Sequence, residues 1–394
     1  MKPLAVSQYT LVTALGHGRE ATSAALRADR TGLAARPFET AKLDTWLGVV
    51  DEADKVALSG HFASFDCRNN RLAELGLRAD GFGDAVRAAA QRWGANRVGV
   101  FLGTSTAGIL QTEVAYRERD AATGALPAWL HYAHTHNTYS VSAYVRAALG
   151  LQGPAYVVST ACSSSAKVFA AAARMIDAGV VDAADVGGVD SLCMTTLYGF
   201  ASLELLSPQI CRPWDAERNG LSIGEAAAFA LLERECAQPL AWLLGAGESS
   251  DGHHMSSPHP EGAGAVQAMH AALVQAGLQP SAVDYLNLHG TGTPGNDAAE
   301  DVAVCAVFGR DLPCSSTKGH TGHTLGAAGG VEAALGMLAL THGVLPAGLN
   351  VQTPDPALKA NYVRETQSRA LRVVASNSFG FGGSNACLVF GAVA

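Results

Sequence analysis

The chain has 394 residues, of which 48% are hydrophobic and 16% are charged, and its formal net charge is −8 at pH 7. The negative charge argues against a nucleic-acid-binding surface, and the apolar composition argues against disorder. Apolar runs are interrupted well before the ~18–20 residues that a membrane-spanning helix needs. The first residues lack the charged, apolar and cleavage regions of a signal peptide, so we expect a cytoplasmic protein.

The eight cysteines are spread along the chain without any C-x-x-C pair. Disulfide frameworks belong to short secreted chains, and zinc sites built from cysteine need closer pairs. We therefore expect most of these thiols to be reduced residues of the core. Cys162 is the exception, because the sequence around it places it at a structural junction.

Strand-like and helix-like segments alternate after the first ~95 residues, which suggest helices and loops with weak boundaries. The predicted strands span residues 97–105, 155–160, 224–234, 282–290, 314–319, 372–378 and 385–391. The predicted helices span residues 137–150, 163–178, 297–309 and 324–343. Segment 155–160 is apolar on both faces, which is typical of a central strand in a covered sheet. The alternation predicts a layered α/β fold.

The two halves of the chain end in similar segments. NGLSIGEAAAFALLE and GFGGSNACLVFG each lead from a glycine-rich loop into an apolar, strand-like run. This similarity indicates an internal duplication, and we expect its boundary near residues 235–245.

Cys162 lies at the corner between a strand and a helix, in the segment VVSTACSSSAKVFAAAARMIDAGV. A helix N-terminus carries free N–H groups and a partial positive charge, which would lower the pKa of the thiol. The small residues that follow would let a substrate carbonyl approach the backbone amides, which could hold an oxyanion. A buried structural cysteine is the alternative interpretation.

Further motifs hold residues capable of chemistry. LNLHGTGTPGND places His289 at a strand end, and STKGHTGHTLGAAGG places Lys318, His320 and His323 before a helix. Neutral imidazoles can exchange protons near neutral pH, although a single histidine is more often structural. His320 and His323 could also bind a metal, but no third ligand is close in sequence. NSFGFGGSNA is a glycine-rich turn that no helix follows, which disfavours phosphate binding.

Ser222 lies in GLSIG, which matches the G-x-S-x-G pattern of hydrolase nucleophiles. That pattern needs a strand before the serine and a helix after it. Here a polar stretch precedes the serine and a strand-like run follows, so we predict that Ser222 is a loop residue.

Four motifs resemble those of the β-ketoacyl-acyl-carrier-protein synthases of the elongating type I/II class, namely TACSSS, NLHGTGTPGND, STKGHTGHTLGAAGG and NSFGFGGSN, in this order. The resemblance is loose before residue 97. It implies a thiolase-like α/β fold in which two duplicated halves form five layers, α-β-α-β-α. We place the halves at residues 1–238, with the nucleophilic cysteine, and 239–394, with the two catalytic histidines.

The resemblance implies a catalytic site made of Cys162, His289 and His323. Lys318 would organise the two histidines, with Glu300 as its ion-pair partner. The other implied site residues are Thr291 and Thr293, which would hold the pantetheine arm, and Phe381, a gate whose N–H would share the oxyanion hole with that of Cys162. Neither a metal nor an organic cofactor is implied.

The implied reaction is a decarboxylative Claisen condensation. Cys162 would take an acyl group from acyl carrier protein, and His289 and His323 would bind the carbonyl of a malonyl thioester. The expected partners are acyl- and malonyl-loaded carrier protein and a second subunit, in a homodimer or in a heterodimer with a related synthase. His323 distinguishes the chain from initiating synthases, which have asparagine there, and we expect Cys387 to be a core residue rather than the second cysteine of a thiolase.

Several alternatives stay open. Thr106, in GTSTAG, stands where an aliphatic pocket residue is expected, so condensation in a polyene or polyketide pathway is an alternative to fatty-acid synthesis. A non-catalytic subunit of the chain-length-factor type is a further alternative, although such subunits typically lose the nucleophile. Arg68 and Arg71 are candidate contacts for the acidic carrier protein, with a solvated helix face as the ordinary alternative.

Overall fold

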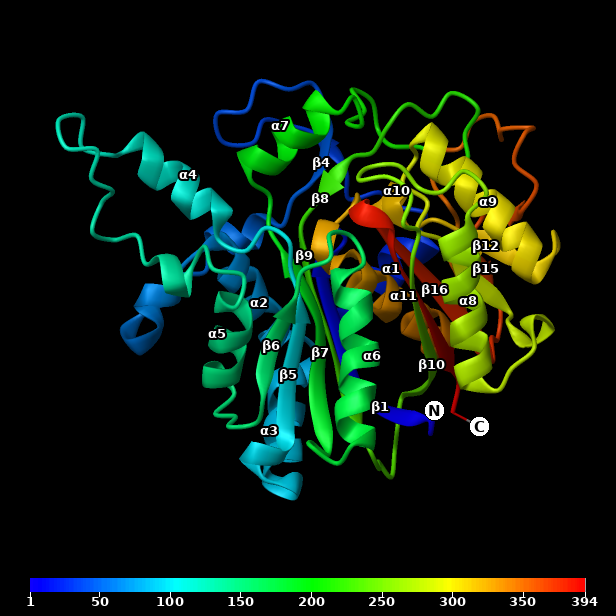
Figure 1. The fold of residues 1–394 in the computed structure, drawn as a ribbon, viewed down its shortest axis with the longest axis horizontal. Helices are drawn as coiled ribbons and strands as arrows, with labels where there is room; N and C mark the ends of the chain where they lie inside the picture. Colours follow the sequence, from blue (N-terminus) through cyan, green and yellow to red (C-terminus); the bar gives the residue numbers. More distant parts are fainter. Residues whose placement is uncertain (394) are drawn as a thin grey trace.

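The computed structural model describes residues 1–393, and its main feature is a large central sheet (Figure 1). The strand order is β14-β12-β11-β16-β17-β10-β1-β9-β7-β5-β6, with β2 added to β1. The first half contains β1 (Leu4–Thr13), β2 (Gly16–His17), β5 (Val98–Gly103), β6 (Ala155–Val158), β7 (Ala183–Asp190) and β9 (Ala226–Glu233). The second half contains β10 (Ala241–Ser250), β11 (Tyr285–Asn287), β12 (Pro313–Ser315), β14 (Asn361–Tyr362), β16 (Val373–Gly380) and β17 (Ser384–Gly391).

Short strands form two small sheets beside the large one. They are β3 (Ala34–Ala35), β4 (Trp46–Gly48) and β8 (Ile223–Gly224) in one sheet, and β13 (Val344–Leu345) and β15 (Gln367–Ser368) in the other.

The two halves of the large sheet have the same internal order. From the centre outward the strands run β1-β9-β7-β5-β6 in one half and β10-β17-β16-β11-β12 in the other. Strands at equal distances from the centre therefore follow the same order along the chain in both halves. In both halves the two inner pairs are antiparallel and the two outer pairs are parallel. β1 and β10 join the halves only through residues 4–6 of β1. The duplication expected from the sequence is therefore present in the topology.

Helices complete five layers. α6 and α11 share one hydrophobic core with both halves of the sheet. α2, α3 and α5 pack on the other face of the first half, and α8 and α9 on the other face of the second. The bounds are α1 (Gly18–Arg27), α2 (Arg68–Arg78), α3 (Phe82–Trp93), α4 (Ile109–Arg117), α5 (Ser140–Ala148), α6 (Ser164–Asp177), α7 (Met194–Ser202), α8 (Ala263–Ala276), α9 (Pro294–Phe308), α10 (Lys318–Thr321) and α11 (Ala328–His342). This arrangement confirms the predicted thiolase-like α-β-α-β-α fold.

The two central helices approach closely because they carry small residues where they meet. A Cβ added to Gly329 in α11 would lie 2.6 Å from the backbone nitrogen of Ala166 in α6. The Ala- and Gly-rich composition of both helices therefore places the start of α6 directly beside the start of α11. This contact positions the site described below.

The structure differs from two of the sequence-based expectations for the strands. The first segment holds the expected helices, α1, α2 and α3, but it also contains β1, an unexpected ten-residue strand at the centre of the sheet. Segment 155–160 forms β6, which lies at the edge of the sheet rather than at its centre. Both faces of β6 nevertheless pack against a hydrophobic core, which explains its apolar side chains. Tyr156 and Val158 pack against the core between the two halves, and Ala155 and Val157 pack against the core of the first half.

Within residues 1–393, no helix is both long and apolar enough to cross a membrane.

Candidate active site

Cys162 lies in the turn between β6 and α6, as the sequence predicted. Ala161, just before it, has a φ of 52°, a left-handed conformation that a residue with a Cβ adopts only when its surroundings impose it. The Ser164 hydroxyl imposes it by accepting a hydrogen bond from Thr160 N (2.9 Å) and donating one to Ala161 O (2.5 Å). Cys162 is only 6% exposed, and the sharp turn directs its sulfur toward the second half of the chain.

A cavity of about 270 Å³ lies beside this sulfur. The sequence-predicted residues that line it are Cys162, His289, Thr291, Thr293, His323 and Phe381. Phe200 of α7 also lines it, and its ring packs against that of Phe381 at a centroid distance of 5.6 Å. The cavity thus has the nucleophile and two imidazoles on one side and aromatic rings on another.

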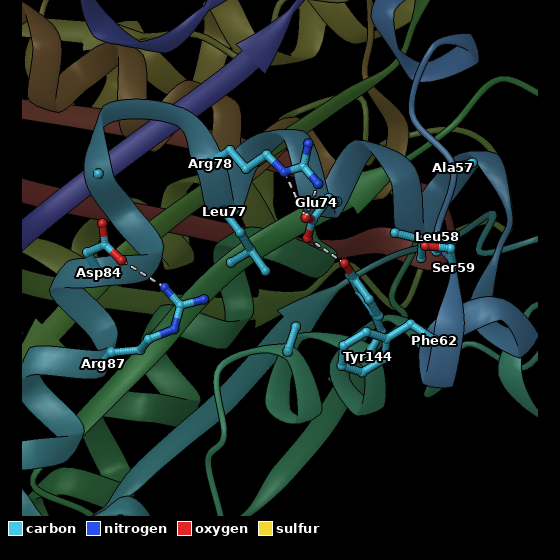
Figure 2. Close-up of a pocket in the computed structure, with 12 residues that line it drawn as sticks. Ala57, Leu58, Ser59, Phe62, Glu74, Leu77, Arg78, Asp84, Arg87 and Tyr144 are labelled. Atoms are coloured by element: carbon cyan, nitrogen blue, oxygen red, sulfur yellow. Dashed lines mark hydrogen bonds and ion pairs between the residues drawn. The ribbon is translucent and has the colours of Figure 1, made fainter.

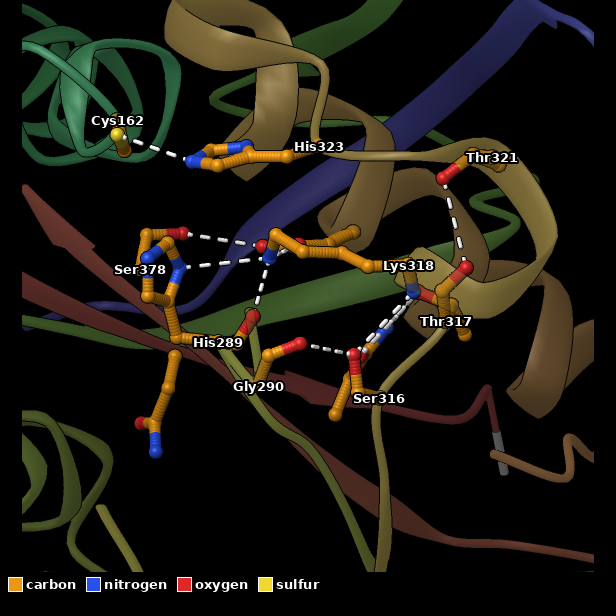
Figure 3. A network of polar contacts seen from close by, with 12 residues as sticks. Cys162, His289, Gly290, Ser316, Thr317, Lys318, Thr321, His323 and Ser378 are labelled. Atoms are coloured by element: carbon orange, nitrogen blue, oxygen red, sulfur yellow. Dashed lines mark hydrogen bonds and ion pairs between the residues drawn. The ribbon is translucent and has the colours of Figure 1, made fainter. Parts of the chain in front are cut away.

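His323 is the imidazole closest to the nucleophile, with 3.0 Å between its Nε2 and the Cys162 sulfur (Figure 3). Its backbone is held from both sides, because His323 N donates to Ser222 O and Gly224 N donates to His323 O. The N–H of Leu325 donates to His323 Nδ1 at 3.2 Å. A neutral imidazole has one N–H and one lone pair, so Nε2 carries the proton and points it at the sulfur.

His289 lies edge-on to His323, with 5.4 Å between the ring centroids. Lys318 Nζ is 3.4 Å from His289 Nδ1 (Figure 3), and an ammonium can only donate. His289 therefore also carries its proton on Nε2. Burial, together with the positive charge of Lys318, lowers the pKa of both histidines well below its usual range, so both rings are neutral at physiological pH. The site thus offers two N–H donors of neutral imidazoles.

Lys318 is buried, and the expectation that Glu300 is its ion-pair partner was wrong. Lys318 pairs with Glu332 of α11 and also donates to the backbone oxygen of His289. Glu300, on α9, instead accepts the N–H groups of His289 (2.8 Å) and Gly290 (2.7 Å). Glu300 lies beside the backbone of the His289 loop, whereas α11 brings Glu332 to the ammonium group. Glu300 therefore supports the loop, and Glu332 balances the charge.

Burial raises the pKa of the Cys162 thiol to about 12, although the charge of Lys318 and the Phe381 N–H lower it. The expected thiolate, stabilised by the helix N-terminus, is therefore not the state of the free site, where the thiol is protonated. The physical reason is that removing a charge from water costs more than the nearby donors return. Burial likewise raises the pKa of Glu332 to about 7.

A metal fits these residues poorly. One ligand atom each from Cys162, His289 and His323 lies within 4.8 Å of the others, a spacing that resembles a metal site. A metal needs a ring-nitrogen lone pair, whereas Leu325 and Lys318 keep the proton on both Nε2 atoms. His320 offers no alternative, because its ring nitrogens contact the backbone oxygens of Arg30 and Ala347.

Other sequence-predicted residues lie as follows. Thr291 and Thr293 line the cavity, and their hydroxyls lie 2.8 Å apart. Thr106 is buried, but it is not among the cavity-lining residues, because its hydroxyl donates to Asp190 at 2.9 Å.

Ser222 is a buried loop residue whose hydroxyl accepts the N–H of Cys211, in agreement with its exclusion as a nucleophile. Cys387 is buried in β17, as expected.

The proposed carrier-protein contacts were partly wrong. Arg68 is buried and pairs with Glu225 and Asp54, so its charge is not available to a docking partner. Arg71 pairs with Asp66. The residue pattern of α2 looked like a solvated face because the sequence does not show that Glu225, far along the chain, lies against it.

Among the buried carboxylates that sequence reasoning missed, Glu332 and Asp190 hydrogen-bond to Lys318 and to Gly326, respectively. Each stands alone in a segment otherwise free of charge, within GAAGGVEAALGMLAL and VGGVDSLCMTTL. An isolated charge in an apolar segment is costly unless it is paired, and this signal could have revealed both.

A second cavity, of about 450 Å³, lies between α2, α3, α5 and the segment before α2 (Figure 2). Its two arginines are already paired, Arg78 with Glu74 and Arg87 with Asp84. None of its lining residues is a cysteine or a histidine, so it lacks the chemistry of the cavity at Cys162.

Two known family descriptions match most of this chain. The family description "Beta-ketoacyl synthase, N-terminal domain" matches residues 2–237, and "Beta-ketoacyl synthase, C-terminal domain" matches residues 240–352. The chain belongs to the β-ketoacyl synthase family.

Individual relatives agree with this family. The chain is 41% identical to the mitochondrial 3-oxoacyl-[acyl-carrier-protein] synthase of Arabidopsis thaliana over 273 residues, which are 64% of this chain and 59% of that protein. It is 36% identical to nodulation protein E of Rhizobium meliloti over 75% of each chain. Among solved structures, the ketosynthase ApeO in complex with its chain length factor ApeC, from Xenorhabdus doucetiae, matches with a TM-score of 0.89 and 38% identity, covering 99% of this chain and 98% of the other.

Proposed function

We propose that the chain is an elongating β-ketoacyl-acyl-carrier-protein synthase, which joins a malonyl unit to an acyl group held on Cys162. The observation that carries this proposal is the cavity in which a cysteine sulfur faces two protonated Nε2 atoms of neutral histidines. Such donors suit an oxygen that becomes negative during the reaction. Family membership and the similarity to a 3-oxoacyl-[acyl-carrier-protein] synthase support the same reaction.

In the first step, the Cys162 sulfur attacks the carbonyl carbon of an acyl thioester. The N–H groups of Cys162 and Phe381 hold the oxyanion, and the Phe381 N–H already lowers the pKa of the Cys162 thiol in the free site. The thioester bond breaks, the proton of the thiol passes to the departing pantetheine sulfur, and the acyl group remains on Cys162. Covalent catalysis thus divides the condensation into two easier reactions.

In the second step, a malonyl thioester enters and its carbonyl oxygen accepts hydrogen bonds from Nε2–H of His289 and His323. The bond to the carboxylate breaks, carbon dioxide leaves, and the electron pair forms an enolate whose oxygen the two donors stabilise. The enolate carbon attacks the acyl carbonyl, and the Cys162 sulfur departs as a thiolate that takes up a proton from solvent and so returns to the thiol of the free site. Donors that strengthen their contacts as charge develops lower the barrier. The product is a β-ketoacyl thioester two carbons longer.

Lys318 supports this step by keeping the proton of His289 on Nε2, and Thr291 and Thr293 line the path that the pantetheine arm would take. We propose no role for a metal or an organic cofactor. The substrates would be the acyl and malonyl forms of an acyl carrier protein. We also propose a cytoplasmic location and a division of the chain at about residue 238, close to where the two family descriptions meet.

We further propose that the protein is a dimer, either with itself or with a related synthase. β6 supports this, because it is an edge strand whose four residues are only partly buried in the single chain. The similar ApeO–ApeC structure is a complex of a ketosynthase with a chain length factor. Because Cys162, His289 and His323 are all present, this chain would be the catalytic subunit of such a pair.

Purified protein, acyl-loaded carrier protein and malonyl-loaded carrier protein test the reaction. We expect mass spectrometry to detect an acyl adduct on Cys162, followed by a carrier-bound β-ketoacyl product. The Cys387→Ala variant is a matched control, because Cys387 is also buried but lies in β17, away from the cavity. An adduct elsewhere on the chain, or no condensation with any acyl length, would contradict the proposal.

A second candidate is the same condensation in a specialised pathway that builds polyene or polyketide chains. The similarity to ApeO, a ketosynthase solved in complex with its chain length factor, favours it. Product lengths measured with a candidate partner subunit and without it would separate the two pathways. A change of product length only with the partner would indicate the specialised pathway.

A further inference from the structure

Asp190 is a buried carboxylate at the end of β7 that holds two separate loops. Its Oδ1 accepts hydrogen bonds from the Thr104 hydroxyl (2.5 Å) and from the N–H groups of Ser105 (2.8 Å) and Thr106 (2.9 Å). Its Oδ2 accepts the Ser105 hydroxyl and the N–H of Gly326, each at 2.5 Å. Asp190 is fully buried, so these donors replace water around its charge.

Gly326 directly follows Leu325, whose conformation is strained. Leu325 has a φ of 57°, in the left-handed region that a residue with a Cβ rarely adopts, and its N–H donates to His323 Nδ1 at 3.2 Å. A Cβ on Gly326 would lie 2.7 Å from Asp190 Oδ2, which shows how closely the two residues fit. The carboxylate therefore holds the chain immediately after the strained residue.

We infer that Asp190 is a positioning residue that fixes which nitrogen of His323 carries the proton. The contacts run from Asp190 to Gly326 N–H, along the backbone to Leu325 N–H, and from there to His323 Nδ1. Occupation of Nδ1 places the proton on Nε2, 3.0 Å from the Cys162 sulfur. Asp190 itself does not touch the substrate. The inference rests on the proposed function, because that reaction needs a hydrogen at Nε2.

The Asp190→Asn variant tests the inference, because it keeps the shape of the side chain and replaces one acceptor oxygen with a donor. An NH₂ group cannot accept from Gly326 N–H or from the hydroxyls and amides of residues 104–106. We expect Leu325 to relax and the proton of His323 to distribute between both ring nitrogens. The condensation rate constant kcat should fall about 10- to 100-fold, which is typical when a residue that orients a functional histidine through hydrogen bonds is replaced. KM for acyl carrier protein should change less than about threefold, because binding surfaces are untouched.

The decisive readout is the tautomer of His323, seen in long-range ¹H–¹⁵N spectra of the full-length protein labelled at histidine. The His323 signal is assigned by its loss in His323→Gln. We expect the Nε2–H tautomer alone in the unmodified protein and a mixture in Asp190→Asn, an effect that a general loss of stability would not produce. Should Asp190→Asn not fold, Ser105→Ala removes one donor to Oδ2, and it should cause a smaller shift in the same direction.

Asp185→Asn is the matched control. It makes the same chemical change in the same strand, and neither oxygen of Asp185 has a hydrogen-bond partner among the described residues. Its His323 spectrum and its kcat should equal those of the unmodified protein. An unchanged His323 tautomer in folded Asp190→Asn would overturn the inference and leave the proposed function intact. Absence of condensation in the unmodified protein would instead overturn the proposed function.

Discussion

Two donors favour a negative charge on the Cys162 sulfur: Nε2–H of His323, 3.0 Å away, and the Phe381 N–H, which lowers the pKa of the thiol. Burial nevertheless keeps the thiol protonated in the free site. Both donors favour the anion once the proton leaves, and they gain strength in a cavity from which water is excluded. Reactivity at this residue therefore depends on the arrival of a thioester that accepts the proton on its departing sulfur. The same burial should slow alkylation of the free protein.

Alkylation by iodoacetamide tests this view of Cys162. Because only the thiolate reacts and its pKa is raised to about 12, the rate should climb roughly tenfold per pH unit and continue to climb above about pH 9. The rate at the Cys162 peptide is measured by quenched mass spectrometry. A plateau below about pH 8 would show that the site holds a thiolate after all.

The Cys162→Ala variant separates the two steps of the proposed reaction. It removes the acyl acceptor but leaves both Nε2–H donors in place, so condensation should be lost while decarboxylation of malonyl thioester continues at a measurable rate. Carbon dioxide release from labelled malonyl thioester is the measurement, and circular dichroism checks folding. Loss of both activities in a folded variant would show that the histidines do not act without the sulfur.

At the scale of elements, the site is assembled where strands and helices end. β6 and α6 place Cys162, β11 and α9 place the His289 loop, and the turn before α11 places His323. The last residue of β7, Asp190, anchors two loops. Asp185 lies inside the same strand, and neither of its oxygens has a hydrogen-bond partner in the described chain. Such an unpaired buried carboxyl costs free energy.

Asp185→Val should therefore stabilise the protein. Burial raises the pKa of Asp185 well above its usual range, so the folded state binds a proton that the unfolded state releases. Stability contributed by that proton is present below the unfolded pKa of about 4 and is lost as pH rises toward the folded pKa. The variant escapes this loss, so its free energy of unfolding should exceed the parent's by about 1 to 3 kcal/mol at neutral pH, and by less in acid. Urea denaturation at both pH values measures the difference, and equal differences would contradict the explanation.

At the scale of the whole molecule, duplication places two similar half-sheets back to back around α6 and α11, and the first half ends in the open edge of β6. An edge strand with apolar side chains on both faces is a template for pairing with another strand. The residues of β6 are half-buried in one chain, and a partner strand would complete their burial. This is the physical basis of the proposed dimer.

Val157→Pro tests the dimer. Val100 N of β5 donates to Pro154 O, and Thr104 N, just after β5, donates to Val158 O. Alternate residues of a strand face the same neighbour, so the N–H of Val157 faces the open edge. Proline removes this donor without touching the β5 ladder, so the dimer should dissociate. Val157→Thr, which keeps the N–H, is the control. Light scattering after size exclusion gives the mass, and an unchanged dimer in Val157→Pro would place the interface elsewhere.

Much of the site could be predicted from local sequence, because its chemistry-bearing residues follow strand ends in recognisable motifs. Cys162, His289 and His323 fell in such motifs and now line one cavity. The partner of Lys318 could not be predicted, since Glu300 and Glu332 lie at similar distances along the chain and only packing decides which carboxylate meets the ammonium. β1 was missed because the polar residues in its sequence conceal a strand that neighbours cover on both sides.

The sequence by itself determined the alternation of strands and helices, the duplicated order of the halves and the residue types of the site, since these depend on patterns within short segments. The tertiary structure alone decided the protonation of Cys162, the tautomers of both histidines and the edge position of β6. These properties depend on burial and on contacts that the fold makes. Some join near neighbours, such as Leu325 N–H with His323 Nδ1, and others join residues more than a hundred positions apart, such as Gly326 with Asp190. Charge and hydrogen bonding are set by what surrounds a group in space, which neighbours along the chain do not reveal.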